Sequence, residues 1–303
     1  MFLNSDSNIG ELIKKIASYG KFNLTDEEMA QGIVSPQDSV NKKSKEALGD
    51  SVQIGDGIFV LSNDELKKIH LSTAELELMR PYYTTNQLGL YWGNSKNTQW
   101  IIYTDSSFQN PRSLDNFPHI KRHLDRFRDV ITSSFRPYGL HRSRDEKFFK
   151  GEKIISLRKC LRPTFTYTDF DCYVSQTFNV IKTDRINLKY LCAILNSRLI
   201  AFWLKYSGKI QGDNFQVDSE PLRSLPIVHA KDQSNLAADT DSISLLYRIL
   251  HQLTPNTDKY NDLKGQIERQ QAKMDEAIYA LYGLSAEEVK QIEAVKLPQE
   301  ETR

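Results

Sequence analysis

The chain has 303 residues, of which 39% are hydrophobic and 26% are charged, and its formal net charge is +1. A chain of this length can bury a substantial core in one or two domains, and its near-neutral charge excludes a surface that is basic throughout. No apolar run approaches the ~20 residues of a membrane span and we find no secretion signal, so we expect a cytoplasmic protein without a membrane partner.

The charges are distributed unevenly along the chain. Residues 119–162 contain 13 Lys and Arg against 5 Asp and Glu, whereas residues 231–303 contain 9 against 13. A basic middle followed by an acidic end indicates one face for an anionic partner and a separate helical appendage.

The first hundred residues predict short helices and strands. Residues 9–20 have the spacing of an amphipathic helix, and residues 40–51 are polar and predict a loop. Residues 54–62 predict a strand with a glycine turn, but their Gly-x-Gly lacks the third glycine of a nucleotide-binding fingerprint. We expect a helix from residue 75 that Pro81 ends, followed by a loop that presents polar and aromatic side chains.

The middle of the chain predicts a sheet. A strand over residues 100–104 and a polar loop over residues 105–118 come first. Residues 119–129 predict a helix whose apolar side chains face inward and whose basic side chains face outward. Residues 135–149 form a loop rich in arginine and aromatic residues. Four strand-like segments follow, at residues 153–158, 164–167, 173–175 and 178–181.

Residues 187–208 carry the most apolar helical pattern in the chain, with leucine and aromatic residues at steps of three and four. Asn187 can cap the start of this helix, and Gly208 can end it in a left-handed conformation. Because so apolar a helix must be buried, we expect other elements to pack around it and to support a polar loop over residues 209–216.

The last part of the chain predicts a helical hairpin. Residues 243–253 and 260–281 each have one apolar helical face, and Gly283 is placed to end the second helix. The sequence from Ser285 has the form of a capping box for a final short helix. Two helices joined by a short connection predict an antiparallel pair.

These patterns predict an α+β fold class, with a mixed or antiparallel sheet packed on a long buried helix and a C-terminal antiparallel helical hairpin. We expect two domains, a recognition domain over residues 1–230 and the hairpin appendage over residues 231–303.

Several phrases of the sequence resemble one family. They are Gln-Gly-Ile at 31–33, Gly-Ile-Phe-Val-Leu-Ser at 57–62, Ile-Leu-Asn-Ser at 194–197, Gly-Lys-x-Gln-Gly at 208–212 and Leu-Arg-Ser-Leu-Pro-Ile at 222–227. In this order they resemble the C-terminal specificity region of TaqI-like adenine DNA methyltransferases and of combined restriction–modification polypeptides. The resemblance covers roughly residues 25–285. It implies recognition of double-stranded DNA, with a methyltransferase catalytic domain or subunit as partner.

The residues that catalysis would require are absent from the sequence. The methyltransferases of this family use an (Asn/Asp/Ser)-Pro-Pro-(Tyr/Phe) motif, and this chain contains no Pro-Pro. The three cysteines lack metal-binding spacing and predict buried free thiols, and no carboxylate set matches a nuclease. We therefore expect no catalytic residue, metal or cofactor in this chain. The resemblance implies that S-adenosylmethionine, and magnesium if the parent enzyme cleaves DNA, belong to a catalytic part.

The candidate DNA-binding residues are basic or carry amides, because guanidinium and ammonium groups bind phosphates and amides suit adenine. They are Arg136, His141, Arg142, Arg144, Lys147, Arg158, Lys159, Arg162, Lys209, Gln211 and Asn214. Each of them could instead belong to a solvated face or to a salt bridge within the fold.

Two functions from different classes follow from these observations. The first is sequence-specific recognition of duplex DNA, as the specificity part of an adenine-specific methyltransferase in a restriction–modification system. The second is a protein-interaction module in which the helical hairpin docks a partner subunit and the basic band is incidental.

Overall fold

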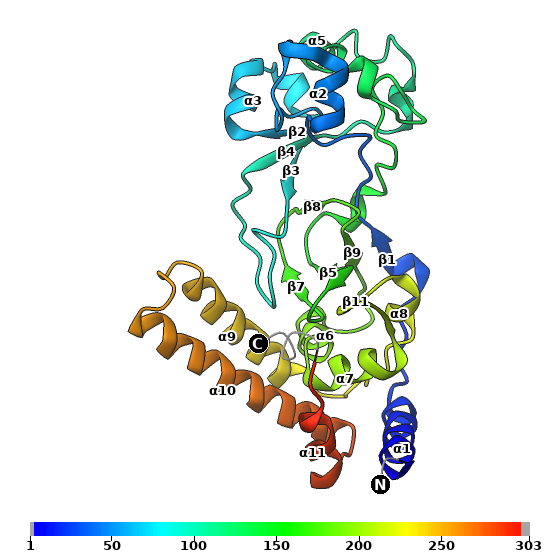
Figure 1. Ribbon diagram of the computed structural model, residues 1–303, viewed down its shortest axis with the longest axis vertical. Coiled ribbons are helices and arrows are strands. Elements are labelled where there is room, and N and C mark those ends of the chain that lie inside the picture. The colour runs from blue at the N-terminus through cyan, green and yellow to red at the C-terminus, as the bar shows by residue number, and fades with distance from the viewer. Residues whose placement is uncertain (1–2, 298–303) are drawn as a thin grey trace.

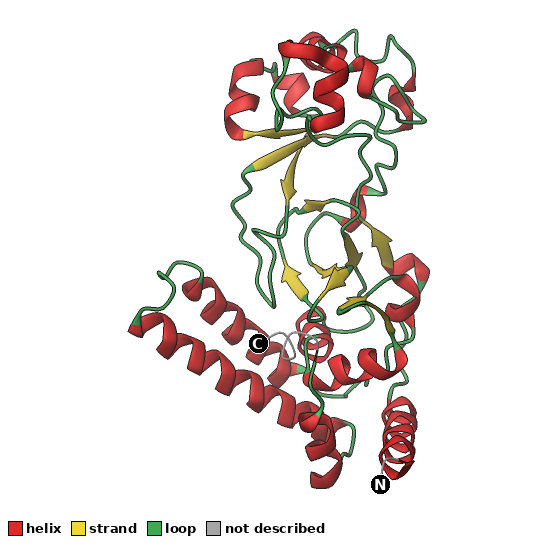
Figure 2. Cartoon of the chain, in the orientation of Figure 1, coloured by secondary structure: helices red, strands yellow, loops and turns green. Residues whose placement is uncertain are grey.

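The computed structural model describes residues 3–297 and confirms the α+β fold class. Helices gather at two ends of an elongated molecule, and the strands lie between them (Figure 2). The helices are α1 (Leu3–Tyr19), α2 (Lys42–Leu48), α3 (Asn63–Ile69), α4 (Thr73–Leu76), α5 (Pro118–Asp125), α6 (Leu188–Leu195), α7 (Arg198–Ser207), α8 (Ser219–Arg223), α9 (Ser234–Leu250), α10 (Asp258–Leu281) and α11 (Ala286–Ala294).

Three small sheets connect the two ends (Figure 1). The strands are β1 (Met29–Gln31), β2 (Val60–Ser62), β3 (Met79–Tyr83), β4 (Gln99–Ile102), β5 (Lys153–Leu157), β6 (Lys159–Cys160), β7 (Phe165–Thr168), β8 (Tyr173–Val174), β9 (Phe178–Ile181), β10 (Lys209–Gln211) and β11 (Asn214–Gln216). The sheet orders are β1-β9-β5-β7, β10-β11-β6 and β2-β4-β3-β8, and only β3 and β8 pair in parallel.

The sheet β1-β9-β5-β7 separates two hydrophobic cores. Successive side chains of a strand point to opposite faces, and here both faces are covered. Ile154 therefore packs in the core formed with α6 and α7, whereas Ile155 packs in the core formed with β2, β3, β4 and α5. This sheet is the rigid support from which the connecting loops extend.

The predicted long helix over residues 187–208 is wrong, because it is divided into α6 and α7. Asn196 binds both backbone groups of Phe165 in β7: its Oδ1 accepts from the N–H at 2.9 Å, and its Nδ2 donates to the carbonyl at 2.8 Å. Ser197 then caps a new helix by accepting from the N–H of Ile200. Gly208 is also not left-handed, since its φ is −90°; a Cβ there would lie 2.5 Å from the Leu204 carbonyl oxygen.

The antiparallel helical hairpin is confirmed. α9 and α10 lie side by side and project from the body (Figure 1). Met274 and Ile278 of α10 share a core with α6 and α7, and Gly283, with a φ of 57°, follows the helix as predicted. Ser285 caps α11 with a capping box.

The connection between β3 and β4 reaches the hairpin. Trp92 stacks on His251 with ring centroids 4.3 Å apart, and Tyr91 stacks on Tyr247. This contact joins the end of the molecule that carries α2, α3 and α5 to the helical end, so the two ends are tied together by more than the sheet.

Three further local predictions are wrong. Residues 40–51 contain α2, which Asn41 caps, rather than a loop. Pro81 does not end a helix but lies within strand β3, opposite Trp100 of β4. The pairing of β3 with β8 begins only at Tyr82, so the N–H that proline lacks is not needed for hydrogen bonds to β8. Residues 209–216 form the hairpin of β10 and β11 instead of a loop.

The cysteines are confirmed as buried free thiols. Within residues 3–297, no helix is long and apolar enough to cross a membrane.

Candidate nucleic-acid interface

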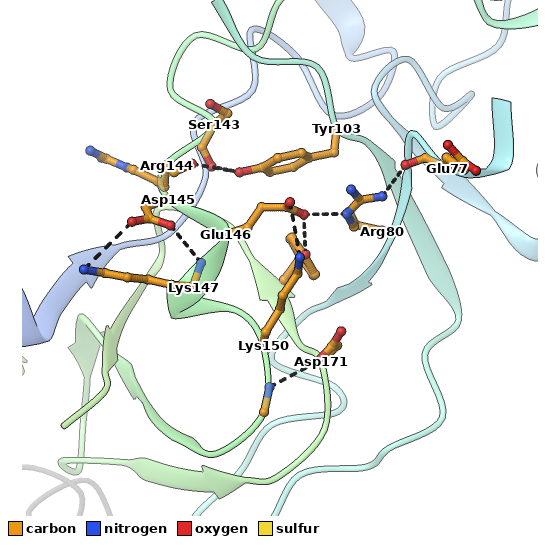
Figure 3. A network of polar contacts seen from close by, with 12 residues as sticks. Glu77, Arg80, Tyr103, Ser143, Arg144, Asp145, Glu146, Lys147, Lys150 and Asp171 are labelled. Carbon is orange, nitrogen blue, oxygen red and sulfur yellow. Dashed lines mark hydrogen bonds and ion pairs between the residues drawn. The ribbon is translucent and has the colours of Figure 1, made fainter. Parts of the chain in front are cut away.

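Tyr103 fixes the backbone of the arginine-rich loop. Its hydroxyl lies 3.0 Å from the carbonyl oxygen of Ser143 and 2.8 Å from that of Arg144, so one donor is shared between two acceptors (Figure 3). Arg144 has a φ of 73°, which is uncommon for a residue other than glycine. A strained conformation persists only where its surroundings hold it, and buried Tyr103 provides that constraint.

Glu146 anchors the other side of this loop. It accepts hydrogen bonds from Arg80 Nε and from the Tyr173 hydroxyl, each at 2.6 Å, and pairs with Lys150. Burial alone raises the pKa of Glu146, but these hydrogen bonds outweigh it and bring the pKa to about 2. The Arg144 side chain extends away from this network (Figure 3). The network therefore neutralises Arg80 and leaves Arg144 to other partners.

Arg144 is bound instead by the segment that contains β1. Its Nε donates to the Gly32 carbonyl oxygen at 3.2 Å, and its Nη2 donates to Oε1 of Gln31 at 2.9 Å. Gly32 has to be glycine, because a Cβ there would lie 2.0 Å from the carbonyl oxygen of Ser175. This close approach brings Gln31 next to a loop 113 residues away in the sequence.

Three guanidinium groups gather at this point; we call Arg142, Arg144 and Arg158 the arginine cluster. Burial lowers the pKa of Arg144, and the positive charges of Arg142 and Arg158 lower it further. Arg142 is exposed, and its backbone pairs with Val34 in both directions. A concentration of like charge costs free energy, which an anionic ligand would relieve.

Arg158 is the most strongly paired member of the arginine cluster. Its Nε and Nη2 contact Asp218 at 2.8 and 2.7 Å, and its Nη1 donates to the carbonyl oxygen of Gln176 at 2.7 Å. The Nε2 of Gln31 lies 3.4 Å from the same oxygen. Arg158 is therefore largely neutralised, whereas Arg142 has no carboxylate partner among residues 3–297.

The sheet of β10, β11 and β6 presents a second set of polar groups. The register pairs Lys209 with Gln216, Gln211 with Asn214 and Lys159 with Gln216. Residues opposite each other in register share a face, so five polar side chains lie together. This polar sheet face consists of Lys159, Lys209, Gln211, Asn214 and Gln216.

The other face of the same sheet explains why the polar side chains point outward. Phe215 and Cys160 are buried on it, opposite each other in register. On the polar sheet face, Nε2 of Gln216 donates to Oε1 of Gln211 at 2.9 Å, which orders both amides. Arg158 directly precedes Lys159 in the chain, so the arginine cluster and the polar sheet face are joined at consecutive residues.

The structure does not gather all the predicted residues. Arg162 lines a cavity of about 390 Å³ with Tyr247 and Asp275, at the junction with the hairpin. Lys147 lines a groove of about 800 Å³ that also contains Glu27, Glu28 and Glu152. These two residues lie in mixed or acidic surroundings, unlike the arginine cluster.

The other two predicted residues lie in the loop before Arg142. Arg136 is exposed and precedes a cis proline, and Nδ1 of His141 lies 3.5 Å from the N–H of Ser134. Neither side chain contacts the arginine cluster in the part of the chain that the structure describes.

Sequence reasoning missed Gln31 and Gln176. The signal at Gln31 is the phrase Gln-Gly-Ile, which indicates the family resemblance but does not by itself mark Gln31 as a site residue. Nothing in the sequence around Gln176 distinguishes it. The two neighbours of Gln176 in the chain, Ser175 and Thr177, line a cavity of about 350 Å³ together with Thr84 and other residues.

This arrangement is suited to binding an anionic ligand. It offers cationic donors for phosphates and fixed amides for base edges. Among residues 3–297, no three His, Cys, Asp or Glu side chains are placed to hold a metal ion.

Comparison with known proteins gives similarities of two kinds, to a domain family and to a solved structure. Residues 95–227 match the model of the TaqI-like C-terminal specificity domain. The chain is also similar to the structure of the type IIL restriction-modification enzyme MmeI in complex with DNA, with a TM-score of 0.59 and 12% identity over 93% of this chain. The match covers 36% of the MmeI chain, so the likeness shows a shared fold with about a third of that enzyme.

No curated protein sequence matches the chain. The family match begins after β3 and ends after α8, so it includes β4, the whole arginine-rich loop, β5 to β11 and the α6–α7 pair. Residues 95–227 thus match the TaqI-like C-terminal specificity domain, which confirms the family resemblance that the sequence motifs indicated.

Proposed function

We propose that this chain recognises a specific sequence in duplex DNA, as the non-catalytic specificity part of an adenine-specific DNA methyltransferase in a restriction–modification system. The arginine cluster beside the polar sheet face is the observation that carries the proposal. The match to a specificity domain and the fold shared with a restriction-modification enzyme solved with DNA support it.

The two parts of the interface have different tasks. Arg142, Lys159 and Lys209 are exposed and lack carboxylate partners within residues 3–297, so they are suited to phosphates. Phosphate contacts set the register of a protein on the duplex, whereas base contacts carry the sequence information. The ordered amides of Gln211 and Gln216 can approach base edges, because a two-stranded ribbon fits the major groove.

The catalytic step is assigned to another part of the enzyme. A methyltransferase domain or subunit would bind S-adenosylmethionine, extrude the adenine and methylate its exocyclic amine. Magnesium would be needed only if the parent enzyme also cleaves DNA. In this proposal residues 1–230 contact DNA, and residues 231–303 support this recognition domain from the helical end. The protein acts in the cytoplasm.

Salt-dependent binding tests the proposal. Anisotropy of a labelled duplex should show an affinity that falls with salt, with a log–log slope of about −0.9 for each phosphate contacted. Arg142→Ala, Lys159→Ala and Lys209→Ala should each make the slope less negative by about 0.9. Lys264→Ala, an exposed lysine on α10, is the matched control and should leave the slope unchanged. Equal slopes for all four variants would contradict the proposed interface.

One observation favours the protein-interaction alternative. Leu245 and Ile249 are 52% and 41% exposed, one helical turn apart on α9. If this face were the functional surface, Leu245→Ser with Ile249→Ser would abolish binding to a methyltransferase subunit, and DNA affinity would be absent at low salt. The DNA proposal expects the same double variant to bind duplex as the parent does.

A further inference from the structure

We propose that Arg144 recognises a guanine in the major groove through the outer edge of its guanidinium group. This inference rests on the proposed DNA-binding function and goes further, since it assigns one base to one side chain. It distinguishes Arg144 from Arg142 and Arg158, which lie in the same cluster and carry the same chemical group.

Arg144 keeps part of its hydrogen-bonding capacity available for a ligand. A guanidinium group has five N–H donors in a planar fork. Nε and Nη2 of Arg144 donate to Gly32 and Gln31, which are consecutive residues, so these bonds occupy one edge of the plane. The edge formed by Nη1 and the second hydrogen of Nη2 has no partner among residues 3–297. That edge presents two parallel donors.

The free edge matches only one base pair well. In the major groove guanine offers two neighbouring acceptors, N7 and O6, whereas adenine offers an acceptor beside a donor. Two parallel N–H donors satisfy both acceptors of guanine but would face an N–H₂ group on adenine. Arginine bound to guanine in this bidentate way is the commonest specific contact in protein–DNA complexes.

Arg144 is also held in place before any ligand binds. Its backbone is fixed in a left-handed conformation by Tyr103, and its guanidinium is fixed by Gln31 and Gly32. Gln31 is itself oriented by Nε2, which points to the carbonyl oxygen of Gln176. A side chain that is already ordered loses little entropy on binding, so its contacts discriminate more sharply. Tyr103 and Gln31 are positioning residues in this scheme.

The other two arginines lack one of these features. Arg158 places Nε and Nη2 on Asp218 and Nη1 on Gln176, so no edge with two parallel donors remains fully open, and its charge is compensated. Arg142 is exposed, and no described residue orients its guanidinium. A mobile, uncompensated cation binds phosphate without regard to sequence.

The test uses the full chain and modified DNA. A duplex would first be selected by the chain from a randomised library, and each guanine of the selected site would then be replaced by 7-deazaguanine, which lacks the N7 acceptor. For one guanine, this replacement should weaken binding by the parent about 5- to 150-fold. Arg144→Ala and Arg144→Gln should bind the unmodified site more weakly and show no further loss with 7-deazaguanine at that position, because neither side chain offers two parallel donors to guanine.

The controls separate the possible failures. Arg142→Ala should bind all duplexes more weakly by a similar factor and keep the full 7-deazaguanine penalty. Arg144→Gln keeps a long polar side chain, so it remains informative if the alanine variant folds poorly. Arg144 variants that keep the same guanine preference and the same penalty would overturn this inference while leaving DNA recognition intact. If the parent bound no duplex at low salt, the proposed function would fail, and the guanine assignment with it.

Discussion

The hydroxyl of Tyr103 lies 2.8 Å from the carbonyl oxygen of Arg144, and this contact holds a non-glycine residue at a φ of 73°. We predict that Tyr103→Phe lowers the free energy of unfolding by about 1 kcal/mol, because two carbonyl oxygens lose a shared donor. Urea denaturation measures this change. Tyr260→Phe on α10 is the matched control, with no hydrogen-bond partner for its hydroxyl within residues 3–297.

The same variant also has an expected effect on DNA. If Tyr103 positions Arg144, Tyr103→Phe should reduce discrimination at the guanine assigned to Arg144 more than it reduces affinity for nonspecific duplex. A purely structural role would lower stability and leave the ratio of specific to nonspecific affinity unchanged.

Gln31→Ala should release the guanidinium of Arg144 without removing any charge. The free side chain would lose its fixed orientation, so we expect specific affinity to fall several-fold while the salt slope stays the same. Isothermal titration at two salt concentrations would show both. Gln53→Ala changes an exposed glutamine outside the interface and serves as the control. A change in slope equal to the loss of one phosphate contact would contradict the positioning role.

Glu75 should make the fold sensitive to acid. This buried carboxylate accepts from the N–H groups of Ser72, His119 and Ile120, and its Oε2 lies 2.8 Å from Nδ1 of His119. Burial raises the pKa of Glu75, but these hydrogen bonds bring it down from 4.5 to about 2. Its stabilising contribution is therefore complete above pH 4.5 and is lost as the pH falls toward 2.

Glu75→Ala removes the group that joins α4 to the start of α5. We predict a loss of stability on the order of 3 kcal/mol at pH 7, because several buried N–H donors lose their acceptor. The difference between parent and variant, measured by urea unfolding, should shrink as the pH falls below 4.5. A difference that is constant from pH 7 to pH 3 would disprove this account.

Asp275 should have the opposite pH dependence. Burial at the junction of α10 and α7 raises the pKa of Asp275 from 3.8 to about 7, although the N–H of Arg198 donates to it. A raised carboxylate pKa stabilises the fold most at low pH, and that contribution is lost as the pH rises from about 4 to about 7. Asp275→Asn keeps the acceptor and removes the charge. Its Tm should exceed that of the parent by at least about 2 °C at pH 8 and match it near pH 4.

Asn196 should be a stability determinant of the sheet–helix junction. Asn196→Ala leaves the buried N–H of Phe165 without its acceptor, whereas the Phe165 carbonyl oxygen keeps the N–H of Tyr91 at 3.0 Å, so we predict a loss of about 2 kcal/mol. Asn196→Asp is a sharper test, since it keeps the acceptor for the Phe165 N–H and lacks the donor for the carbonyl. It should also be destabilising, and more so as the pH rises through the range in which aspartate ionises.

Local signals predicted the helices of the C-terminal part well. Gly283 and Ser285 act through their immediate neighbours, and the apolar spacing of α10 reflects a single buried face. The division between α6 and α7 escaped prediction because the apolar pattern continues across it, while the cause is the bond from Asn196 to β7. Residues 209–216 carry only a short hairpin signal, since Ile210 and Phe215 each alternate with polar residues on either side of Gly212 and Asp213, and three residues on each side are few for a strand.

The site was only partly predictable for a related reason. Composition identified the arginine-rich loop. The fold, however, determines which of the arginine side chains lie close together. Arg162 is four residues from Arg158 and still lies at the hairpin junction. His123, expected on a basic outer face, is buried and lies 2.9 Å from the Ile58 carbonyl oxygen, because it completes the packing of α5. Contacts between distant segments, such as Gln31 with Arg144, leave no periodic trace in a single sequence.

Strand β1 has a consequence for engineering. It pairs with β9 and delivers Gln31 and Gly32 to Arg144, yet it precedes the segment 95–227 that corresponds to the specificity domain. A chimera that receives only residues 95–227 would contain Arg144, but the residues contacting its guanidinium would come from the β1 segment of the host protein. Grafts that include residues 29–34 of the donor should therefore transfer selectivity more faithfully than those cut at the domain boundary.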